Sequence, residues 1–492
     1  MIIRGYEVKQ QLICKNKNIL DKIYLKKKNV DIKTVDISIN DILNKMFDIE
    51  GNSKLSSDDN IMNEYYNKSK EMIMNEIINK YSNYNISPNF SIQSEIKNHI
   101  VECVVDLYIE NDDEIIIFNI LSSTYNSINK MFSKKEYSET KENNKSYIEI
   151  KEKNIEKFHD LIKKVDMYYY NYVYKNSHFY NEYKKVRYVL ALINSNKSNN
   201  MLYEIDMTKA INAYEKDYES LLNSVIEDIE NSNVLNLNNE YCVGPKCKYY
   251  SICNLTKNLI DEPEVETFDK EGLIKEIKKI TYPIYYLDFE SFQCPYPRFE
   301  NEKAYDQHVF QFSIIKQNNK ESQLEYFDFI AKDNINDYRY LLFKKLVETI
   351  DIKNGGTVVV YNKTFEKNRI LEASKIYNDL KNDLLNINNS LYDLLYLIKG
   401  NEKGKYNYYN TKFNNSFSIK KVLPALTNIS YDNLDINNGL KASEEYANFH
   451  NVNEDERKNS INKLKEYCRL DTYGMYLILE EIKKKVNFDY QN

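Results

Sequence analysis

Tryptophan is absent from this chain, and the residues that shape tight loops or bind metals as imidazoles are scarce. The 492 residues include 10 glycines, 7 prolines and 5 histidines. No Gly-x-Gly-x-x-Gly or Walker loop occurs, so a nucleotide-hydrolysing motor is not expected, and the histidines form no ligand pair such as H-E-x-x-H. No run reaches the roughly 18 apolar residues of a membrane span, and Met1–Arg4 does not begin a leader peptide. We therefore expect a cytoplasmic protein with no membrane partner.

An excess of positive charge is also missing. The formal net charge is −6, so any nucleic acid must meet a local patch of Lys and Arg on an acidic whole. Charged residues make up 29% and hydrophobic residues 42%, a balance typical of globular proteins, and the length favours two or three domains. The 45 tyrosines are spread over the chain and do not mark a base-stacking platform, which would need a cluster.

The first half of the chain carries a hairpin pattern and ends at a break. Val101–Ile109 and Glu114–Leu121 are rich in β-forming residues and flank an Asn-Asp-Asp turn, which predicts two antiparallel strands. The acidic segment Asp261–Glu264 contains a proline and interrupts the pattern. We therefore predict one domain over residues 1–260 and a second over residues 270–492.

The second half predicts a mixed α/β domain. A strand over Ile284–Phe289 and an antiparallel neighbour over Gln311–Lys316 come first, and Thr357–Tyr361 is a short apolar run of the kind found in buried strands. Helical patterns follow from Glu366 and again over Ile461–Lys485. Strands followed by helices, with a helix between the first strand and the buried strand, are typical of α/β packing.

Three acidic motifs follow one another in this second half. They are Asp288-x-Glu290, Asn362-x-x-Phe365-Glu366 and Tyr467-x-x-x-Asp471. Asp288 and Glu290, near the end of a strand, leave the same face and would repel each other without a cation between them. Tyr467 and Asp471 share one face of a helix. Four spaced carboxylates and a tyrosine can hold two Mg²⁺ or Mn²⁺ ions and activate a water, and such an apparatus cuts phosphodiesters.

This ordered set of motifs resembles the DnaQ-like, or DEDD, superfamily of 3′–5′ exonucleases in its tyrosine-containing branch. The resemblance covers the predicted second domain and implies an RNase H-like fold. It also implies metal ligation by three acids and orientation of the water by a tyrosine: Asp288, Glu290, Asp471 and Tyr467. Glu366 stands where the superfamily usually has Asp. Asp393 could instead supply the fourth acid, with a helix-surface or capping aspartate as the alternative interpretation.

Further segments resemble an uncharacterised bacterial family that joins such an exonuclease domain to an N-terminal RecB-like domain. They are Tyr286–Phe292, Phe310–Ser313, Ser418–Leu426 and Tyr467–Thr472. Lys420 and Lys421 lie near a helix start and are candidates for contacts to backbone phosphates, with a solvated lysine pair as the alternative. Asn362 is a further candidate for substrate binding, and a single-stranded end of nucleic acid is the expected partner.

Seven cysteines in a chain of this kind do not suggest a disulfide framework. Cys242-x4-Cys247-x5-Cys253 lies in a loop with Gly and Pro, and Cys14 lies far upstream. One distant and three clustered cysteines resemble the iron–sulfur staple of RecB-like nucleases, which implies a [4Fe–4S] cluster. Four thiolates also suit zinc, and unligated buried cysteines are a third interpretation. The other three are expected to be small core residues: Cys103, Cys294 and Cys468.

The RecB-like resemblance also implies a PD-(D/E)XK restriction-endonuclease-like fold with a second metal site on the N-terminal hairpin. Asp106 fits the first position of that site. On the next strand Asn119 and Leu121 stand where Glu and Lys are expected, and Tyr170 replaces a Gln. Leucine cannot activate a water, and Asn is a poor ligand for a hard cation. We therefore predict a degenerate nuclease domain kept for binding or scaffolding.

The sequence as a whole predicts a metal-dependent 3′–5′ exonuclease that acts through its C-terminal domain. The alternative is a noncatalytic nucleic-acid-binding or assembly subunit that retains two nuclease folds. Nothing in the residues reports a contact to a 2′-hydroxyl group, so DNA and RNA remain equal candidates for the substrate. Protein partners and oligomeric state are not indicated.

Overall fold

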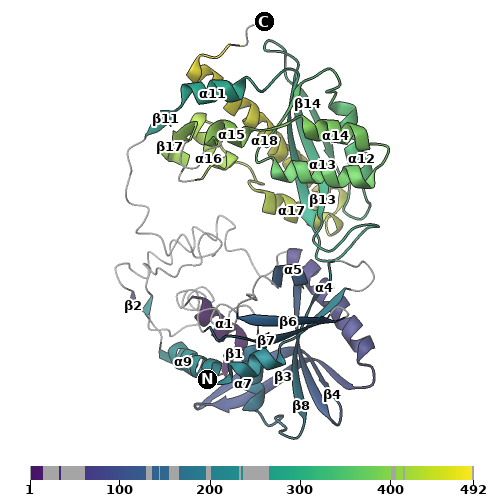
Figure 1. Ribbon diagram of the computed structural model, residues 1–492, viewed down its shortest axis with the longest axis vertical. Helices are drawn as coiled ribbons and strands as arrows, with labels where there is room; N and C mark the ends of the chain where they lie inside the picture. The colour runs from purple at the N-terminus through teal and green to yellow at the C-terminus, as the bar shows by residue number, and fades with distance from the viewer. Residues whose placement is uncertain are drawn as a thin grey trace. The chain divides into compact units, whose positions relative to one another are not determined.

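The chain falls into two compact units (Figure 1). The computed structural model describes residues 2–14, 33–34, 61–128, 136–142, 145–154, 166–195, 201–231, 234–235, 265–400, 406–413 and 416–489. The first unit comprises Met1–Asp261 with Pro295–Tyr305, and the second comprises Glu262–Cys294 with Asp306–Asn492. Helices and mixed sheets make up both units, which confirms the α/β class. No helix of the described ranges is long and apolar enough to cross a membrane.

The first unit is built on one large mixed sheet. Its strands are β1 (Ile2–Arg4), β3 (Asn85–Ile96), β4 (His99–Glu110), β5 (Glu114–Thr124), β6 (Tyr137–Glu142), β7 (Lys145–Ile150), β8 (Lys185–Ile193) and β9 (Leu202–Asp206). The order is β1-β4-β5-β8-β9-β7-β6, with β3 paired to β4. The predicted hairpin is confirmed as the antiparallel pair β4–β5. In its turn the Asn111 side chain accepts the backbone N–H groups of Asp113 and Glu114, which explains the Asn at this position.

Tyrosine fills much of the core of this unit. The surrounding helices are α1 (Gly5–Ile13), α4 (Ile61–Lys80), α5 (Tyr125–Ile128), α7 (Met167–Lys175), α8 (Thr208–Ala213) and α9 (Glu215–Asn231). A separate parallel pair joins β2 (Lys33–Thr34) to β10 (Val234–Leu235). Five tyrosines of the core are essentially inaccessible to solvent: Tyr168, Tyr174, Tyr188, Tyr214 and Tyr218. Buried phenols need hydrogen-bond partners, and the backbone N–H of Asn154 supplies one to Tyr214 Oη at 2.9 Å.

The second unit contains a five-stranded mixed sheet in the order β14-β13-β12-β15-β16. The strands are β12 (Ile284–Gln293), β13 (Gln307–Gln317), β14 (Glu325–Ile330), β15 (Thr357–Val360) and β16 (Leu391–Asp393). The strand β13 is antiparallel to both of its neighbours, whereas β15 is parallel to β12 and β16 is parallel to β15. The three strands predicted in this half are therefore confirmed, and β14 and β16 extend the sheet at its two edges. A small antiparallel pair joins β11 (Glu266–Phe268) to β17 (Tyr408–Asn410).

Helices cover both faces of this sheet. They are α11 (Lys270–Ile277), α12 (Arg339–Thr349), α13 (Thr364–Ile376), α14 (Lys381–Asn389), α15 (Leu394–Lys399), α16 (Ile419–Leu426), α17 (Gly439–Ala447) and α18 (Glu454–Val486), with short 3₁₀ turns at Thr411–Phe413 and Asn448–His450. The longest, α18, begins at a capping box in which the side chains of Asn453 and Glu456 each accept a backbone N–H of the other. It packs against β12, β13, β14 and β15.

The alternation of side chains along β12 divides its residues between the two faces. Tyr285, Leu287 and Phe289 belong to the core that includes residues of α12, α13 and α14, which Figure 1 shows grouped beside the sheet. The intervening residues must point to the opposite face, because successive side chains of a strand alternate. That opposite face is the one on which α18 lies, and it carries Asp288 and Glu290.

Candidate metal site in the C-terminal unit

The strand β12 contributes two neighbouring carboxylates. Asp288 lies opposite Ser313 and Glu290 lies opposite Gln311 in the pairing with β13. Glu290 is buried, whereas Asp288 keeps some solvent access. The register shifts between Glu290 and Ser291, so the strand is irregular immediately after the second carboxylate. Such irregularities re-aim side chains at the ends of strands, where sites are commonly built.

The helix α18 places Tyr467 and Asp471 one turn apart, and both are buried. Close packing of α16 against α18 occurs one turn further on, at Gly474. A Cβ atom on this glycine would lie 2.9 Å from Leu423 Cδ2, which is closer than side chains normally approach. The glycine therefore lets α16 come near enough for its side chains to reach the carboxylates.

The second motif contributes Glu366 from the first turn of α13. Its side chain is buried, and Oε2 has no hydrogen-bond partner among the residues that the structure describes. Burial raises the pKa of Glu366 to about 8, and the charges of Asp393 and Asp471 add to the effect. A buried carboxylate oxygen without a donor is costly unless a cation or a proton completes its environment.

Asp393, the other candidate for the fourth acid, is engaged by the backbone. Its Oδ1 accepts the N–H groups of Asn362 at 2.9 Å and Leu395 at 3.0 Å, and its Oδ2 accepts the N–H of Lys363 at 3.0 Å. The carboxylate thereby caps α15 and holds the turn after β15, where Asn362 has a positive φ of 66°. Asn362 contributes to this turn through its backbone. Of the two acids, Glu366 is the one with a buried oxygen that lacks a hydrogen-bond partner among the described residues.

Burial is the main influence on the four acids, and repulsion between them adds to it. Burial raises the pKa of Asp288 well above its ordinary value, and the charges of Asp471 and Glu290 add to the effect. Burial and Asp471 also raise the pKa of Glu290 well above its ordinary value. For Asp471 burial raises the pKa to about 6, although a hydrogen bond from Tyr431 opposes this. Each acid thus disfavours ionisation of the others, and only positive charge can relieve the group.

The donor set fits hard divalent cations. Ligand atoms of Asp288, Glu290 and Cys468 lie within 4.8 Å of one another. Cys468 Sγ is also 3.4 Å from Asp288 Oδ2, and burial raises the pKa of this thiol well above its ordinary value. A protonated thiol is a poor ligand, so the carboxylate oxygens of Asp288 and Glu290 are the candidate ligands in this group. Oxygen ligands suit Mg²⁺ and Mn²⁺.

Two residues complete the site in ways that the sequence did not indicate. Tyr431 Oη donates a 2.7 Å hydrogen bond to Asp471 Oδ1. Lys420 Nζ donates to Tyr467 Oη at 3.0 Å and to the carbonyl of Asn437 at 2.9 Å. Sequence reasoning missed Tyr431, because the chain contains 45 tyrosines and no recognisable motif surrounds this one.

Lys420 therefore lies among the carboxylates themselves. Burial lowers its pKa, whereas the charges of Asp471 and Glu290 act in the opposite direction. Its ammonium group is 4.9 Å from the centre of the Tyr467 ring and 5.4 Å from that of Tyr431. The neighbouring Lys421 is exposed and borders a cavity of about 330 Å³ that Lys412, Lys420 and Tyr431 also line. The prediction that both lysines contact phosphate stays a prediction.

The N-terminal hairpin brings a different set of residues together. Asp106 Oδ2 accepts the side-chain amide of Asn119 at 3.1 Å and the backbone N–H of Ile120 at 2.7 Å. Lys70 of α4 lies 3.8 Å from Asp106 Oδ1, and Tyr170 is near enough for the charge of Asp106 to act on it. The side-chain neighbours of Asp106 are thus an amide and a lysine. A hard cation at this place would need further acids as ligands.

Only part of the predicted cysteine cluster can be placed. Cys14 follows α1 and is partly exposed, whereas Cys242, Cys247 and Cys253 lie outside the described residues. The [4Fe–4S] and zinc interpretations therefore stay predictions. The two remaining cysteines, Cys103 and Cys294, are buried.

Comparison with known proteins yields relatives without an assigned activity. Residues 285–418 match a family described as "Domain of unknown function (DUF2779)", a segment that includes β12 and α13 and ends before α16. Uncharacterized protein MG366 of Mycoplasma genitalium is 30% identical over 225 residues, which are 41% of this chain and 32% of that protein. Uncharacterized protein UU173 of Ureaplasma parvum is 23% identical over 275 residues, which are 49% of this chain and 39% of that protein.

The Uncharacterized protein MG366 homolog of Mycoplasma pneumoniae is 30% identical over 210 residues, which are 39% of this chain and 31% of that protein. The chain therefore spans about a third of the length of the curated relatives it matches. No solved structure gives a significant match.

Proposed function

We propose that the C-terminal unit is a metal-dependent 3′–5′ exonuclease that hydrolyses phosphodiester bonds with two divalent cations. The observation that carries the proposal is the buried, unpartnered Oε2 of Glu366 beside three further acids whose charges act on one another. A group of this kind is costly for a scaffold to keep and is useful to an enzyme that needs cations there. The polarity of cleavage comes from the resemblance to DnaQ-like exonucleases.

The topology of the second unit supports an RNase H-like fold. Numbered within this sheet alone, the strands lie in the order 3-2-1-4-5, and only the second strand is antiparallel to the first. The four acids come from the first strand, from the helix after the fourth strand and from the last long helix. The N-terminal unit, in which Asp106 has Asn119 and Lys70 for neighbours, is proposed to bind or scaffold as a degenerate PD-(D/E)XK domain.

The ligands of the cations would be Asp288, Glu290, Glu366 and Asp471. Bound there, the cations would polarise the attacking water and stabilise the leaving oxygen. Because Tyr431 donates to Oδ1 of Asp471, the other oxygen of this acid is oriented for ligation.

Hydrogen bonds hold the side chain of Tyr467, the tyrosine of the third motif. Lys420 donates to Tyr467 Oη, and a hydrogen bond between Tyr467 and Asp471 lowers the pKa of that acid. The phenol is thereby held beside Asp471, where it is proposed to position the water. The positive charge of Lys420 also offsets part of the negative charge of the acids before substrate arrives. Lys421, with Lys412, borders the adjacent cavity and is proposed to contact the phosphates of the strand.

Degradation of 5′-labelled single-stranded DNA and RNA with Mn²⁺ tests the proposal. Wild type is expected to produce a ladder that shortens from the 3′ end on at least one substrate, and Asp288→Ala should lower the rate by several orders of magnitude. Glu348→Ala is the matched control, since Glu348 is an exposed acid on α12, which packs on the opposite face of the sheet. Equal rates for wild type and Asp288→Ala would refute the assignment. Binding without cleavage by the wild type would favour a noncatalytic nucleic-acid-binding subunit.

A further inference from the structure

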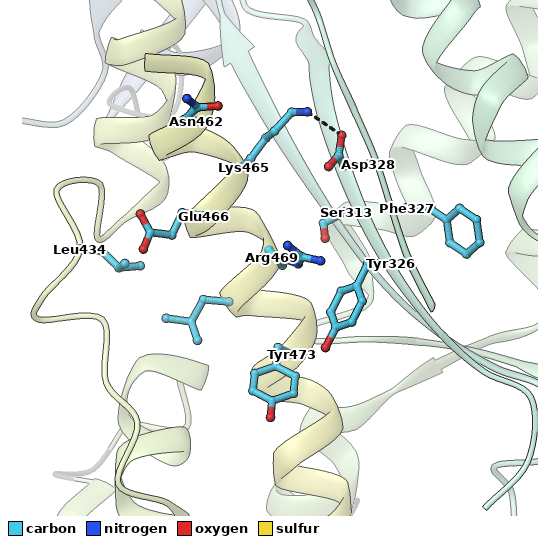
Figure 2. A pocket seen from close by; sticks show the side chains of 11 residues that line it. Ser313, Tyr326, Phe327, Asp328, Leu434, Asn462, Lys465, Glu466, Arg469 and Tyr473 are labelled. Carbon is cyan, nitrogen blue, oxygen red and sulfur yellow. Dashed lines mark ion pairs between the residues drawn. The ribbon is translucent and has the colours of Figure 1, made fainter. Parts of the chain in front are cut away.

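A second cavity lies in the C-terminal unit, beside α18 and the edge strand β14. Its volume is about 590 Å³, within the range of sites that take small organic ligands. The residues that matter most for its chemistry are Tyr326, Leu434, Lys465, Glu466, Arg469 and Tyr473, and Figure 2 shows them around one stretch of the helix.

The cavity and the carboxylates lie on the same face of the sheet but on opposite sides of α18. Asp288 pairs with Ser313, and Ser313 pairs with Asp328, so these three residues share the face on which the helix packs. Ser313 and Asp328 line the cavity. Around the helix, Arg469 and Tyr473 project on the side away from Tyr467 and Asp471, because residues two positions apart differ by about 200°. The cavity is thus a separate site that shares one helix with the acids.

A guanidinium group and an aromatic ring form the centre of the cavity. The guanidinium carbon of Arg469 is 4.1 Å from the centre of the Tyr326 ring, a geometry of stacking. Arg469 forms no ion pair with another described residue, whereas the other cation of the cavity, Lys465, is held by Asp328 at 3.0 Å. The guanidinium is exposed, and its planar edge can bind an anion through two hydrogen bonds.

The remaining walls provide surfaces for a flat ring. Figure 2 shows Tyr473 one turn along α18 from Arg469, with Tyr326 on one side of the helix and Leu434 and Glu466 on the other. Phe327 points away from this space into the core on the far face of the sheet. The phenol rings of Tyr326 and Tyr473 lie beside Arg469 and can stack on a planar group.

We propose that this cavity binds a nucleotide, with the base against the tyrosines and the phosphate on Arg469. A nucleotide joins a planar base to an anionic phosphate. The ring surfaces of the cavity fit the base, and the unpaired guanidinium fits the phosphate. A free mononucleotide and one residue of a single strand present the same chemistry. The binding does not involve the four acids or their cations, so it goes beyond the exonuclease proposal and stands without it.

Isothermal titration calorimetry of the full chain in EDTA tests the site without catalysis. Adenosine 5′-monophosphate should bind saturably to wild type and equally well to Asp288→Ala, and adenosine should bind more weakly because it lacks the phosphate. Arg469→Leu should weaken the mononucleotide roughly 10-fold or more, and Arg469→Lys should restore only part of the affinity. Lys458→Met, which removes an exposed cation of α18 outside the cavity, is the control and should bind as wild type does.

A competing oligonucleotide distinguishes the two sources of the ligand. Displacement of the mononucleotide by a short oligodeoxyadenylate would assign the cavity to a strand, and binding of the mononucleotide without displacement would assign it to a free nucleotide. Either result supports the proposal. It is overturned if neither probe binds, or if Arg469→Leu and Tyr326→Leu both bind as tightly as wild type. The exonuclease proposal is tested by a different measurement, and the absence of cleavage with Mn²⁺ would refute it.

Discussion

Replacing Glu366 with Gln should make the metal-free protein more stable, and the gain should grow with pH. The glutamine keeps the shape of the side chain but cannot ionise. In the folded protein the pKa of Glu366 rises from its ordinary 4.5 to about 8, chiefly through burial. A carboxyl with a raised folded pKa binds its proton more tightly when folded, so it costs stability as pH rises from 4.5 to 8.

The size of the effect follows from the same two values. At 1.36 kcal/mol for each pKa unit, wild type loses about 5 kcal/mol over the whole interval. Near pH 4.5 both proteins carry a neutral side chain, and their free energies of unfolding should be nearly equal. Above pH 8 the variant should be more stable by several kcal/mol, the value of about 5 kcal/mol being an upper bound because the neighbouring acids share the repulsion.

Urea unfolding in EDTA at pH 5, 6.5 and 8 measures this difference. Glu348→Gln on the exposed surface of α12 is the control, and it should stay within about 0.5 kcal/mol of wild type at every pH. Excess Mn²⁺ should narrow the advantage of the variant at pH 8 by up to about 2.7 kcal/mol at a cation concentration 100 times Kd, because the wild type keeps a ligand that the variant lacks. A variant whose advantage in EDTA is the same at pH 5 and pH 8 would refute the description of Glu366 as a buried acid under repulsion.

Three further predictions concern the surroundings of the acids. Tyr431→Phe removes the donor that orients Asp471, so kcat should fall about 10-fold; an unchanged kcat would contradict this. Lys420→Met should lower kcat, whereas Lys421→Ala should raise KM and reduce the salt slope of binding by about 1; identical effects of both would argue against separate roles. Gly474→Val should cost about 1–3 kcal/mol in urea unfolding because its side chain meets Leu423, and wild-type stability would show that α16 can move aside.

Local patterns were sufficient for much of the second unit. The strands around Ile284–Phe289, Gln311–Lys316 and Thr357–Tyr361 are present, because apolar runs and alternation report directly on burial. The long helix after Ile461 is present as well and begins earlier, at Glu454, where the capping box sets its start. The strands β14 and β16 were missed because an edge strand need not be apolar and a three-residue strand has too few residues to show a period.

The amino-acid sequence alone determined which acids are available and the local structure of each, since the motifs on β12, α13 and α18 are short enough to be read from spacing. It placed Glu366 in the second motif and left Asp393 as an alternative for the fourth acid or as a capping aspartate. Only the tertiary structure showed that three backbone N–H groups are directed onto Asp393.

Partners that are distant in the chain were likewise decided by packing. Tyr431 and Asp471 are 40 residues apart, and Lys420 and Tyr467 are 47 residues apart. Tyr326 of the strand β14 contacts Arg469 of the helix α18. No local period links such pairs, since they come together only when helices and the sheet bury their apolar faces against each other.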